Sequence, residues 1–173
     1  DDACGDLPNL ILNKDITSVT PNADGTYIVT YTITVSNNGG ATGTYNLTDE
    51  AAFDDDITIL GGSFTIDQGG PLAVGDFIGD PSPVTLATNI DIDAGATHTY
   101  TISFFVNLDL SGDANDNDGG DNVYTACSEP GNGPGSNPGE GLYNIARLDD
   151  DADGDVDQED DACGDLPNVT MVK

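Results

Sequence analysis

Aspartates at regular intervals between Asp149 and Asp160 have the spacing of a calcium-binding loop. With Asp149 as position 1, aspartates fill the ligand positions 1, 3, 5, 7, 9 and 12 of an EF-hand loop. The predicted ligands are Asp149, Asp151, Asp153, Asp155, Asp157 and Asp160. Gly154 at position 6 permits the sharp turn that brings carboxylates around one hard cation, and we expect Val156 to anchor the loop by packing inward. The sequence therefore predicts calcium as a cofactor.

The pattern predicts a loop and not an EF-hand fold, because no helical periodicity flanks it. Asp160 stands where EF-hands usually have Glu, and in this the loop resembles dockerin and thrombospondin type 3 loops. Cys163, which follows, strengthens the resemblance to thrombospondin type 3 loops. The alternative is a solvated acidic linker, which is the usual role of a charge run. The agreement of the glycine and of every ligand position favours the calcium loop.

A second acidic stretch, residues 109–121, fits no complete calcium-loop template. Its candidate ligands are Asp109, Asp113, Asn115, Asp116, Asp118 and Asp121. If the strands of a sandwich run alternately up and down, this stretch and the chain exit at Asp149 lie at the same end. We therefore expect a calcium cluster there that stiffens the junction with a neighbouring module.

The overall charge limits the partners. Three basic residues face 32 acidic ones, so the formal net charge is -29, which excludes nucleic acid and anionic membrane surfaces as natural partners and favours cations. We expect no membrane insertion, because no apolar stretch reaches about 18 residues. The start of the chain lacks the order of a signal peptide, so we expect any export signal to lie outside it.

An exact repeat divides the chain. The nine residues from Asp160 to Asn168 repeat those from Asp1 to Asn9, so the period is 160 minus 1, or 159 residues. Such a period is the length of a whole domain, which indicates a tandem array. We expect a sandwich over 1–148, a calcium-binding junction loop over 149–161, and the start of the next repeat over 162–173, where VTMVK corresponds to the first strand.

The cysteine positions favour an oxidising, extracellular setting. Cys4 and Cys163 occupy the same position in successive repeats, so each repeat has two cysteines. Counting strands up and down places Cys127 beside Cys4, and we expect that pair to be bridged. The competing pair is Cys127 with Cys163.

Alternating apolar and polar residues predict strands and no helix. The clearest are Thr26–Val35, with Tyr27, Val29, Tyr31, Ile33 and Val35 on one face, and Thr97–Leu108, with Tyr100, Ile102, Phe104 and Val106 on one face. Further strands are expected at Leu10–Ile16, Thr42–Thr48, Ile57–Ile66, Val84–Ile92, Asn122–Cys127 and Gly141–Leu148. Short alternating strands separated by turns indicate an all-β fold, an immunoglobulin-like antiparallel β-sandwich.

Three segments of the sequence, YTITVSNNGG from Tyr31, the following residues 41–49, and YNIARL from Tyr143, resemble the domain-of-unknown-function-eleven repeat of prokaryotic surface proteins. The resemblance covers about residues 10–50 and 97–148. It implies an immunoglobulin-like sandwich that occurs in tandem at the cell surface, and it implies no chemistry.

These observations predict a structural module of an extracellular fibre, filament or adhesin stalk, with identical neighbouring modules as partners. The neighbours are parts of one chain or separate subunits. If they are separate subunits, the strand from Val169 completes the neighbour's sheet. The alternative is a module that binds a glycan or a protein through the long loops 67–95 and 128–140. We expect no enzyme, because no catalytic motif is present and His98 lacks a nearby Cys or Ser partner.

Overall fold

The structure is a computed structural model, and it describes residues 5–66, 83–110, 123–133 and 135–167. Within these residues the chain forms strands and no helix. The strands are β1 (Leu10–Pro21), β2 (Tyr27–Asn37), β3 (Gly43–Ala51), β4 (Ile57–Ile66), β5 (Val84–Ile92), β6 (Thr97–Leu108), β7 (Gly131–Asn132), β8 (Asn144–Asp149) and β9 (Gln158–Cys163).

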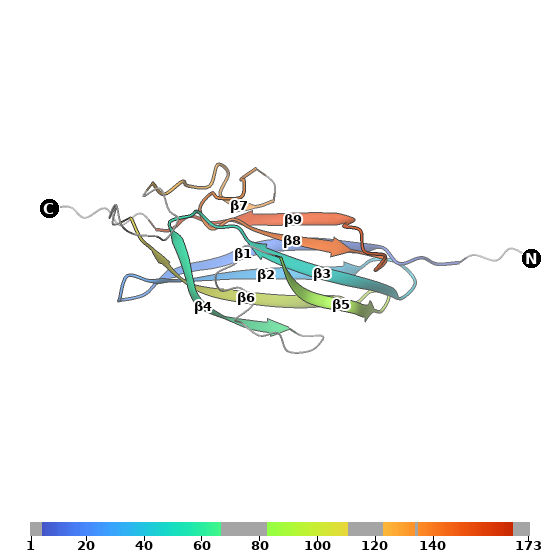
Figure 1. Cartoon of the computed structure of the whole chain (residues 1–173). Coiled ribbons are helices and arrows are strands. Elements are labelled where there is room, and N and C mark those ends of the chain that lie inside the picture. The colour runs from blue at the N-terminus through green and yellow to red at the C-terminus, as the bar shows by residue number, and fades with distance from the viewer. Residues whose placement is uncertain (1–4, 67–82, 111–122, 134, 168–173) are drawn as a thin grey trace, which may run out of the picture.

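Two antiparallel sheets pack face to face, which confirms the predicted β-sandwich (Figure 1). One sheet has the order β1-β2-β6-β4, and the other has the order β5-β3-β8-β9-β7. The first order corresponds to the A-B-E-D sheet of an immunoglobulin sandwich. The neighbours β3-β8-β9 of the second order correspond to its C-F-G sheet. In this correspondence β9 is the last strand of the sandwich, the one that completes the second sheet.

The core forms where the sequence alternates most strictly. On β2, Val29, Tyr31, Ile33 and Val35 are buried, and on β6 the same is true of Tyr100, Ile102, Phe104 and Val106, as predicted. These two strands pair over ten residues, and the threonines between the buried residues face the other way. The second sheet adds Tyr45, Leu47 and Leu148 to the same core, and Leu142, two residues before β8, is also part of it.

The predicted strand ends differ from the observed ones in two places. Residues 123–127 of the expected strand Asn122–Cys127 form no strand. In contrast, Gln158–Cys163 forms β9, which pairs with β8 and buries Ala162 and Cys163. The expected boundary between residues 161 and 162 therefore falls inside a strand of this sandwich. The strand β4 is irregular at Gly61, because its pairing with β6 shifts register between Ile59 and Gly61.

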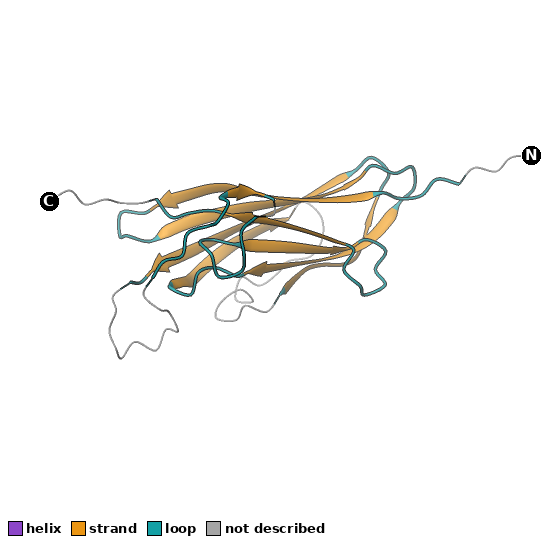
Figure 2. Ribbon diagram, turned by 90° about the horizontal axis from the view of Figure 1, so that it is seen from above, coloured by secondary structure: helices purple, strands orange, loops and turns teal. Residues whose placement is uncertain are grey.

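The sandwich is elongated, and the described chain begins and ends at opposite ends of it (Figures 1 and 2). The start of β1, the turn between β2 and β3 and the loop between β8 and β9 lie at one end. The turn between β1 and β2, the start of β4 and the end of β9 lie at the other.

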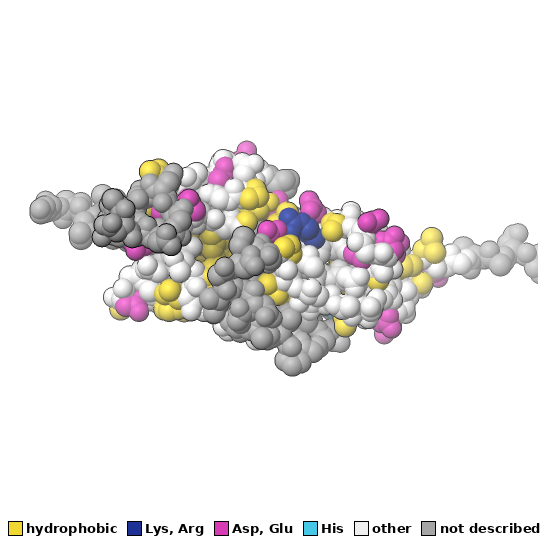
Figure 3. Space-filling view, in the orientation of Figure 1, with side chains coloured by type: hydrophobic (Ala, Val, Ile, Leu, Met, Phe, Trp, Pro, Cys, Tyr) yellow, Lys and Arg dark blue, Asp and Glu magenta, His cyan; other side chains and the backbone are white. Residues whose placement is uncertain are grey.

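Acidic side chains are scattered over the face in Figure 3, which shows basic atoms at a single place. Among the described residues no helix is long and apolar enough to cross a membrane.

Candidate metal centre and the disulfide-tied end

The loop after β8 is folded around the side chain of Asp149. One carboxylate oxygen of Asp149 accepts a hydrogen bond from the backbone N–H of Asp153 (3.1 Å), and the other accepts from Gly154 (2.9 Å). The side-chain amide of Asn46 on β3 also donates to Asp149 (2.9 Å). Gly154 has a φ of 104°, which favours glycine, so the expected turn at this position is present. The loop therefore holds its first acidic residue in place through its own backbone.

Three of the predicted ligands lie together. Carboxylate oxygens of Asp149, Asp151 and Asp153 all lie within 4.8 Å of one another, close enough to hold one metal ion. Desolvation and the neighbouring negative charges, chiefly that of Asp153, raise the pKa of Asp151. A bound cation would relieve this repulsion, because it favours the ionised form of every carboxylate near it. The donor set is made only of carboxylate oxygens, which suits a hard cation.

The other predicted ligands are placed differently. Asp155 is exposed, and the carboxylate of Asp157 accepts from the backbone N–H of Asp150 (2.9 Å). Asp160 lies in β9, where one oxygen accepts from the backbone N–H of Lys14 (2.6 Å) and the other from Asp161 (3.2 Å). Among the described residues these three acids are outside the group around Asp149.

The expected inward packing of Val156 is wrong, because its side chain is 53% exposed. The loop is held from within by the hydrogen bonds to Asp149 and from outside by Asn46, and not by an apolar anchor. An EF-hand loop needs such an anchor to join two paired loops, whereas here the strands on either side, β8 and β9, are already paired.

A second group of acids was not predicted. Asp54, Asp55 and Asp56, between β3 and β4, have carboxylate oxygens within 4.8 Å of one another. Asp54 accepts from the backbone N–H groups of Asp56 (3.1 Å) and Thr125 (2.8 Å) and is almost fully buried. In the sequence this group is visible only as a run of three aspartates. The run lacks the alternating spacing of a calcium loop, so the sequence pattern did not predict a metal site there.

The second acidic stretch lies mainly outside the described residues, and so do five of its candidates: Asp113, Asn115, Asp116, Asp118 and Asp121. Asp109 is described, and its backbone N–H donates to the carbonyl of Asp56 (3.0 Å). This contact places the start of the stretch beside the second group of acids, at the end of β6.

The prediction that both acidic stretches begin at the same end of the sandwich is wrong. The Asp149 loop lies beside the start of β1, where Gln158 donates to the carbonyl of Leu10 (2.8 Å). Asp109 and Asp54–Asp56 lie at the opposite end (Figure 1). The reason is the expected strand Asn122–Cys127, whose residues 123–127 form no strand: the chain makes one crossing fewer between Asp109 and Asp149 than the prediction counted.

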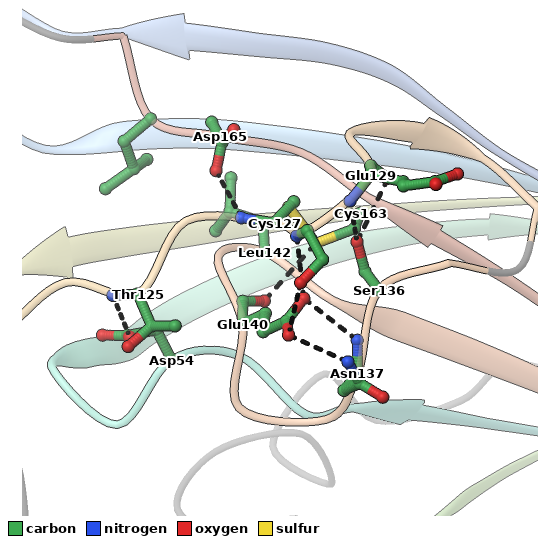
Figure 4. The surroundings of a disulfide bond; sticks show 12 residues. Asp54, Thr125, Cys127, Glu129, Ser136, Asn137, Glu140, Leu142, Cys163 and Asp165 are labelled. Carbon is green, nitrogen blue, oxygen red and sulfur yellow. Dashed lines mark hydrogen bonds between the residues drawn. A yellow bond between two sulfur atoms is a disulfide. The ribbon is translucent and has the colours of Figure 1, made fainter.

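The disulfide joins Cys127 to Cys163, so the predicted pair of Cys4 with Cys127 is wrong and the competing pair is observed (Figure 4). The prediction counted a strand over 122–127 to bring Cys127 beside Cys4, but residues 123–127 form no strand, and β9 carries Cys163 back along β8 to Cys127. The bond fastens the end of β9 to the segment after residue 123, which forms no strand there. Cys4 lies outside the described residues.

Hydrogen bonds to two acids surround the disulfide (Figure 4). The Glu140 carboxylate accepts from the backbone N–H and hydroxyl of Ser128 (both 2.8 Å) and from the side-chain amide of Asn137 (2.9 Å). These bonds lower the pKa of Glu140 to about 2. Asp165 accepts from the backbone N–H of Cys127 (2.9 Å). The loop 128–140, expected as a recognition loop, is thus tied to the disulfide.

His98 is buried, and its Nδ1 forms a hydrogen bond with the hydroxyl of Tyr45 (2.8 Å). That hydroxyl also contacts the hydroxyl of Tyr100 (2.6 Å). Of the other expected recognition loop, residues 67–82 lie outside the described residues and Val84–Ile92 forms β5.

Comparison with family models, curated proteins and solved structures gives no significant match to this chain. The resemblance to the surface-protein repeat therefore stays a prediction.

Proposed function

We propose that the chain is a structural module of an extracellular tandem-repeat fibre or adhesin stalk, in which sandwiches are joined end to end through short, stiff junctions that bind calcium. The layout of the described chain supports this proposal, because it enters the sandwich at one end and leaves at the other (Figure 2). Modules with this layout extend a chain and do not fold it back. The disulfide fits an oxidising setting outside the cell.

The repeated nonapeptide carries the argument, because its two copies have different neighbours. In the copy at 160–168, the described residues 160–167 form the end of β9 and then pack on this sandwich: Leu166 is 8% exposed, and its N–H donates to the hydroxyl of Tyr124 (3.1 Å). The copy at 1–9 leads into β1. There the carbonyls of Leu7 and Asn9 accept from Gly40 (3.1 Å) and Asn38 (2.8 Å) in the turn between β2 and β3.

In an array, each nonapeptide would make both sets of contacts at once. It would contact the preceding sandwich as Asp165 and Leu166 contact this one. It would contact the following sandwich as Leu7 and Asn9 contact the turn between β2 and β3 of this one. Leu7 is 78% exposed, whereas Leu166, the same position one repeat later, is buried. A preceding sandwich would cover Leu7 in the same way. A linker held at both ends leaves few residues free to act as a hinge.

The acidic groups fit the same arrangement. The Asp149 loop lies at the end where the chain enters, and Asp54–Asp56 lies at the end where it leaves. In an array these two groups face each other across each junction. With a net charge of -29 per chain, such a junction needs cations to offset the repulsion, and calcium suits donors made of carboxylate oxygens.

The repeat also assigns Cys4. It corresponds to Cys163, so in an array Cys4 is the last cysteine of the preceding sandwich and pairs with that sandwich's equivalent of Cys127. Every sandwich then has one disulfide of the kind observed, and none crosses a junction.

The test uses a chain with two repeats, made by duplicating residues 10–168 within the sequence. Small-angle X-ray scattering in calcium should give the maximum dimension of two sandwiches in line, and a chelator should shorten the mean dimension as the junction begins to bend. A matched chain with Asp149→Asn, Asp151→Asn and Asp153→Asn in the second repeat should behave in calcium as the parent does in chelator. A flexible junction in saturating calcium would contradict the proposal.

A further inference from the structure

A lysine lies in the core of the sandwich. On β1 the buried positions alternate as Leu10, Leu12 and Lys14, and Lys14 is fully buried. Its Nζ lies 2.5 Å from a carboxylate oxygen of Asp49 on β3, in the facing sheet, and Asp49 is also fully buried. Arg147, the other basic residue that the structure describes, is partly exposed and pairs with Glu50 and Glu159.

An asparagine without hydrogen-bond partners lies next to this pair. Asn144 on β8 is fully buried, and neither its amide nitrogen nor its carbonyl oxygen has a hydrogen-bond partner. Asp49 pairs with Ala146 and Ala51 pairs with Asn144, so Asp49 and Asn144 are diagonal neighbours on one face of the sheet. The second oxygen of Asp49 also has no partner. Buried polar groups are normally hydrogen-bonded, so this amide needs an explanation.

Aromatic rings line the site beside Lys14. The ring centroid of Tyr31 lies 5.1 Å from Lys14 Nζ, and the rings of Phe53 and Phe104 pack against Tyr31. The Tyr31 hydroxyl donates to the carbonyl of Leu142, two residues before Asn144, and so fixes the start of β8. The site is apolar and closed to water apart from these polar groups.

The surroundings favour the neutral forms of both charged groups. Burial lowers the pKa of Lys14, against the opposing effect of Asp49. Burial raises the pKa of Asp49, against the opposing effects of Lys14 and, more weakly, of the nearby Asn144 amide. A proton that passes from Lys14 to Asp49 across their short contact gives a neutral amine and a neutral carboxylic acid. A neutral amine is a nucleophile, and a carboxylic acid beside an amide is a general acid.

We propose that Lys14 and Asn144 become joined by an isopeptide bond, an amide between Lys14 Nζ and Asn144 Cγ, which links the first strand of one sheet to a central strand of the other. Lys14 Nζ attacks Asn144 Cγ while Asp49 donates its proton to the carbonyl oxygen. Asp49 then takes a proton from the attacking nitrogen and passes it to the amide nitrogen of Asn144. The Cγ–Nδ2 bond breaks, ammonia leaves, and the proton on the carbonyl oxygen returns to Asp49.

The atoms and charges balance without any further reactant. The ammonium of Lys14, the carboxylate of Asp49 and the amide of Asn144 give a secondary amide, one molecule of ammonia and protonated Asp49. An amide between Lys14 and Asp49 themselves would instead release water, and it would leave Asn144 without a partner or a role. The molecule that is lost therefore distinguishes the two cross-links.

The first test is the intact mass of the reduced 173-residue chain. We expect a mass lower by one ammonia molecule than the sequence gives. Trypsin should cut after Arg147 and fail to cut after Lys14, because an amidated lysine is not a substrate. Digestion at acidic residues should then give a branched peptide that joins Lys14 to Asn144.

Variants provide the controls. Asn144→Ala and Asp49→Asn should both keep the full mass, whereas Lys173→Arg, which changes the only other lysine, should still lose ammonia. If Asn144→Ala fails to fold, Asn144→Asp serves in its place, because any bond that it forms releases water and not ammonia.

Three results would overturn the proposal. The first is a parent chain of full mass. The second is the loss of water, which assigns the bond to Asp49. The third is a loss of ammonia from a chain that trypsin still cuts after Lys14, which would indicate a cyclic imide at an Asn-Gly sequence such as Asn38-Gly39 or Asn132-Gly133.

Discussion

The side chain of Gln158 forms two hydrogen bonds to the backbone of β1, accepting from the N–H of Leu12 (3.1 Å) and donating to the carbonyl of Leu10 (2.8 Å). Gln158 begins β9 in one sheet, and β1 is the edge strand of the other. One amide side chain thus takes the place of a neighbouring strand and closes this side of the sandwich. The Asp160 carboxylate continues the contact two residues further on, where it accepts from Lys14 N–H.

The change Gln158→Ala should lower the free energy of unfolding by about 1 to 3 kcal/mol, because two backbone groups of β1 lose their partner. Urea denaturation followed by tyrosine fluorescence measures the change. Asn13→Ala provides the control: it removes an exposed bond between Asn13 and Asp15 on the same strand and should cost less than about 0.5 kcal/mol. Equal costs for both variants would show that Gln158 is an ordinary surface residue.

The sequence predicted the fold because the strands that make the core alternate strictly. Tyr31 lies in a run where apolar residues alternate with threonine, and Phe104 lies in a run that alternates in the same way except at Phe105, so the residue pattern alone assigns a buried face to each strand. The same reasoning failed for β9, whose sequence QEDDAC has four polar residues in a row. Its burial comes from β8, β1 and the disulfide, and the contacts with β1 and with Cys127 join residues far apart in the sequence.

The candidate metal centre was predicted in part for a related reason. Spacing along the chain reports which side chains a loop can turn inward, and this sufficed for Asp149, Asp151 and Asp153. Spacing could not show that Asp160 is held by β1. It also could not show that Lys14, Asp49 and Asn144 lie together, because they belong to three strands in two sheets.

The disulfide should contribute about 3 to 4 kcal/mol to stability, the value that the chain-entropy model gives for a loop closed over 36 positions. Replacing both Cys127 and Cys163 with Ala should therefore lower the free energy of unfolding by that amount. Cys4→Ala should leave it unchanged within error. If Cys4→Ala destabilised the chain as strongly as the double variant, the bridge in solution would involve Cys4.

Calcium should bind at the loop after β8, and isothermal titration measures it. The variant Asp149→Asn should weaken binding most, because Asp149 both faces the other carboxylates and organises the loop through Asp153 and Gly154. Asp24→Asn is a matched control, since Asp24 lies in the turn between β1 and β2 at the opposite end. The absence of any calcium-dependent heat in the parent chain would contradict the assignment.

The Tyr45 hydroxyl contacts His98 and Tyr100 in the core, so Tyr45→Phe should cost about 1 to 3 kcal/mol by removing a partner from buried polar groups. Thr44→Ala, on the exposed face of the same strand, removes only the bond to Asp91 and should cost far less. Thermal denaturation compares the two. A neutral effect of Tyr45→Phe would mean that His98 and Tyr100 satisfy each other without it.

The pH dependence of the loop 128–140 follows from Glu140. Four hydrogen bonds, from Ser128 and Asn137, favour its ionised form and lower its pKa from 4.5 to about 2. Because the pKa is lower in the folded state, the stabilising contribution is fully present above pH 4.5 and is lost as the pH falls towards about 2. The amide N–H of Ser128, followed by NMR, should therefore shift with a midpoint near 2, and Glu140→Gln should abolish that shift. A midpoint near 4.5 would show that these hydrogen bonds do not hold the loop in solution.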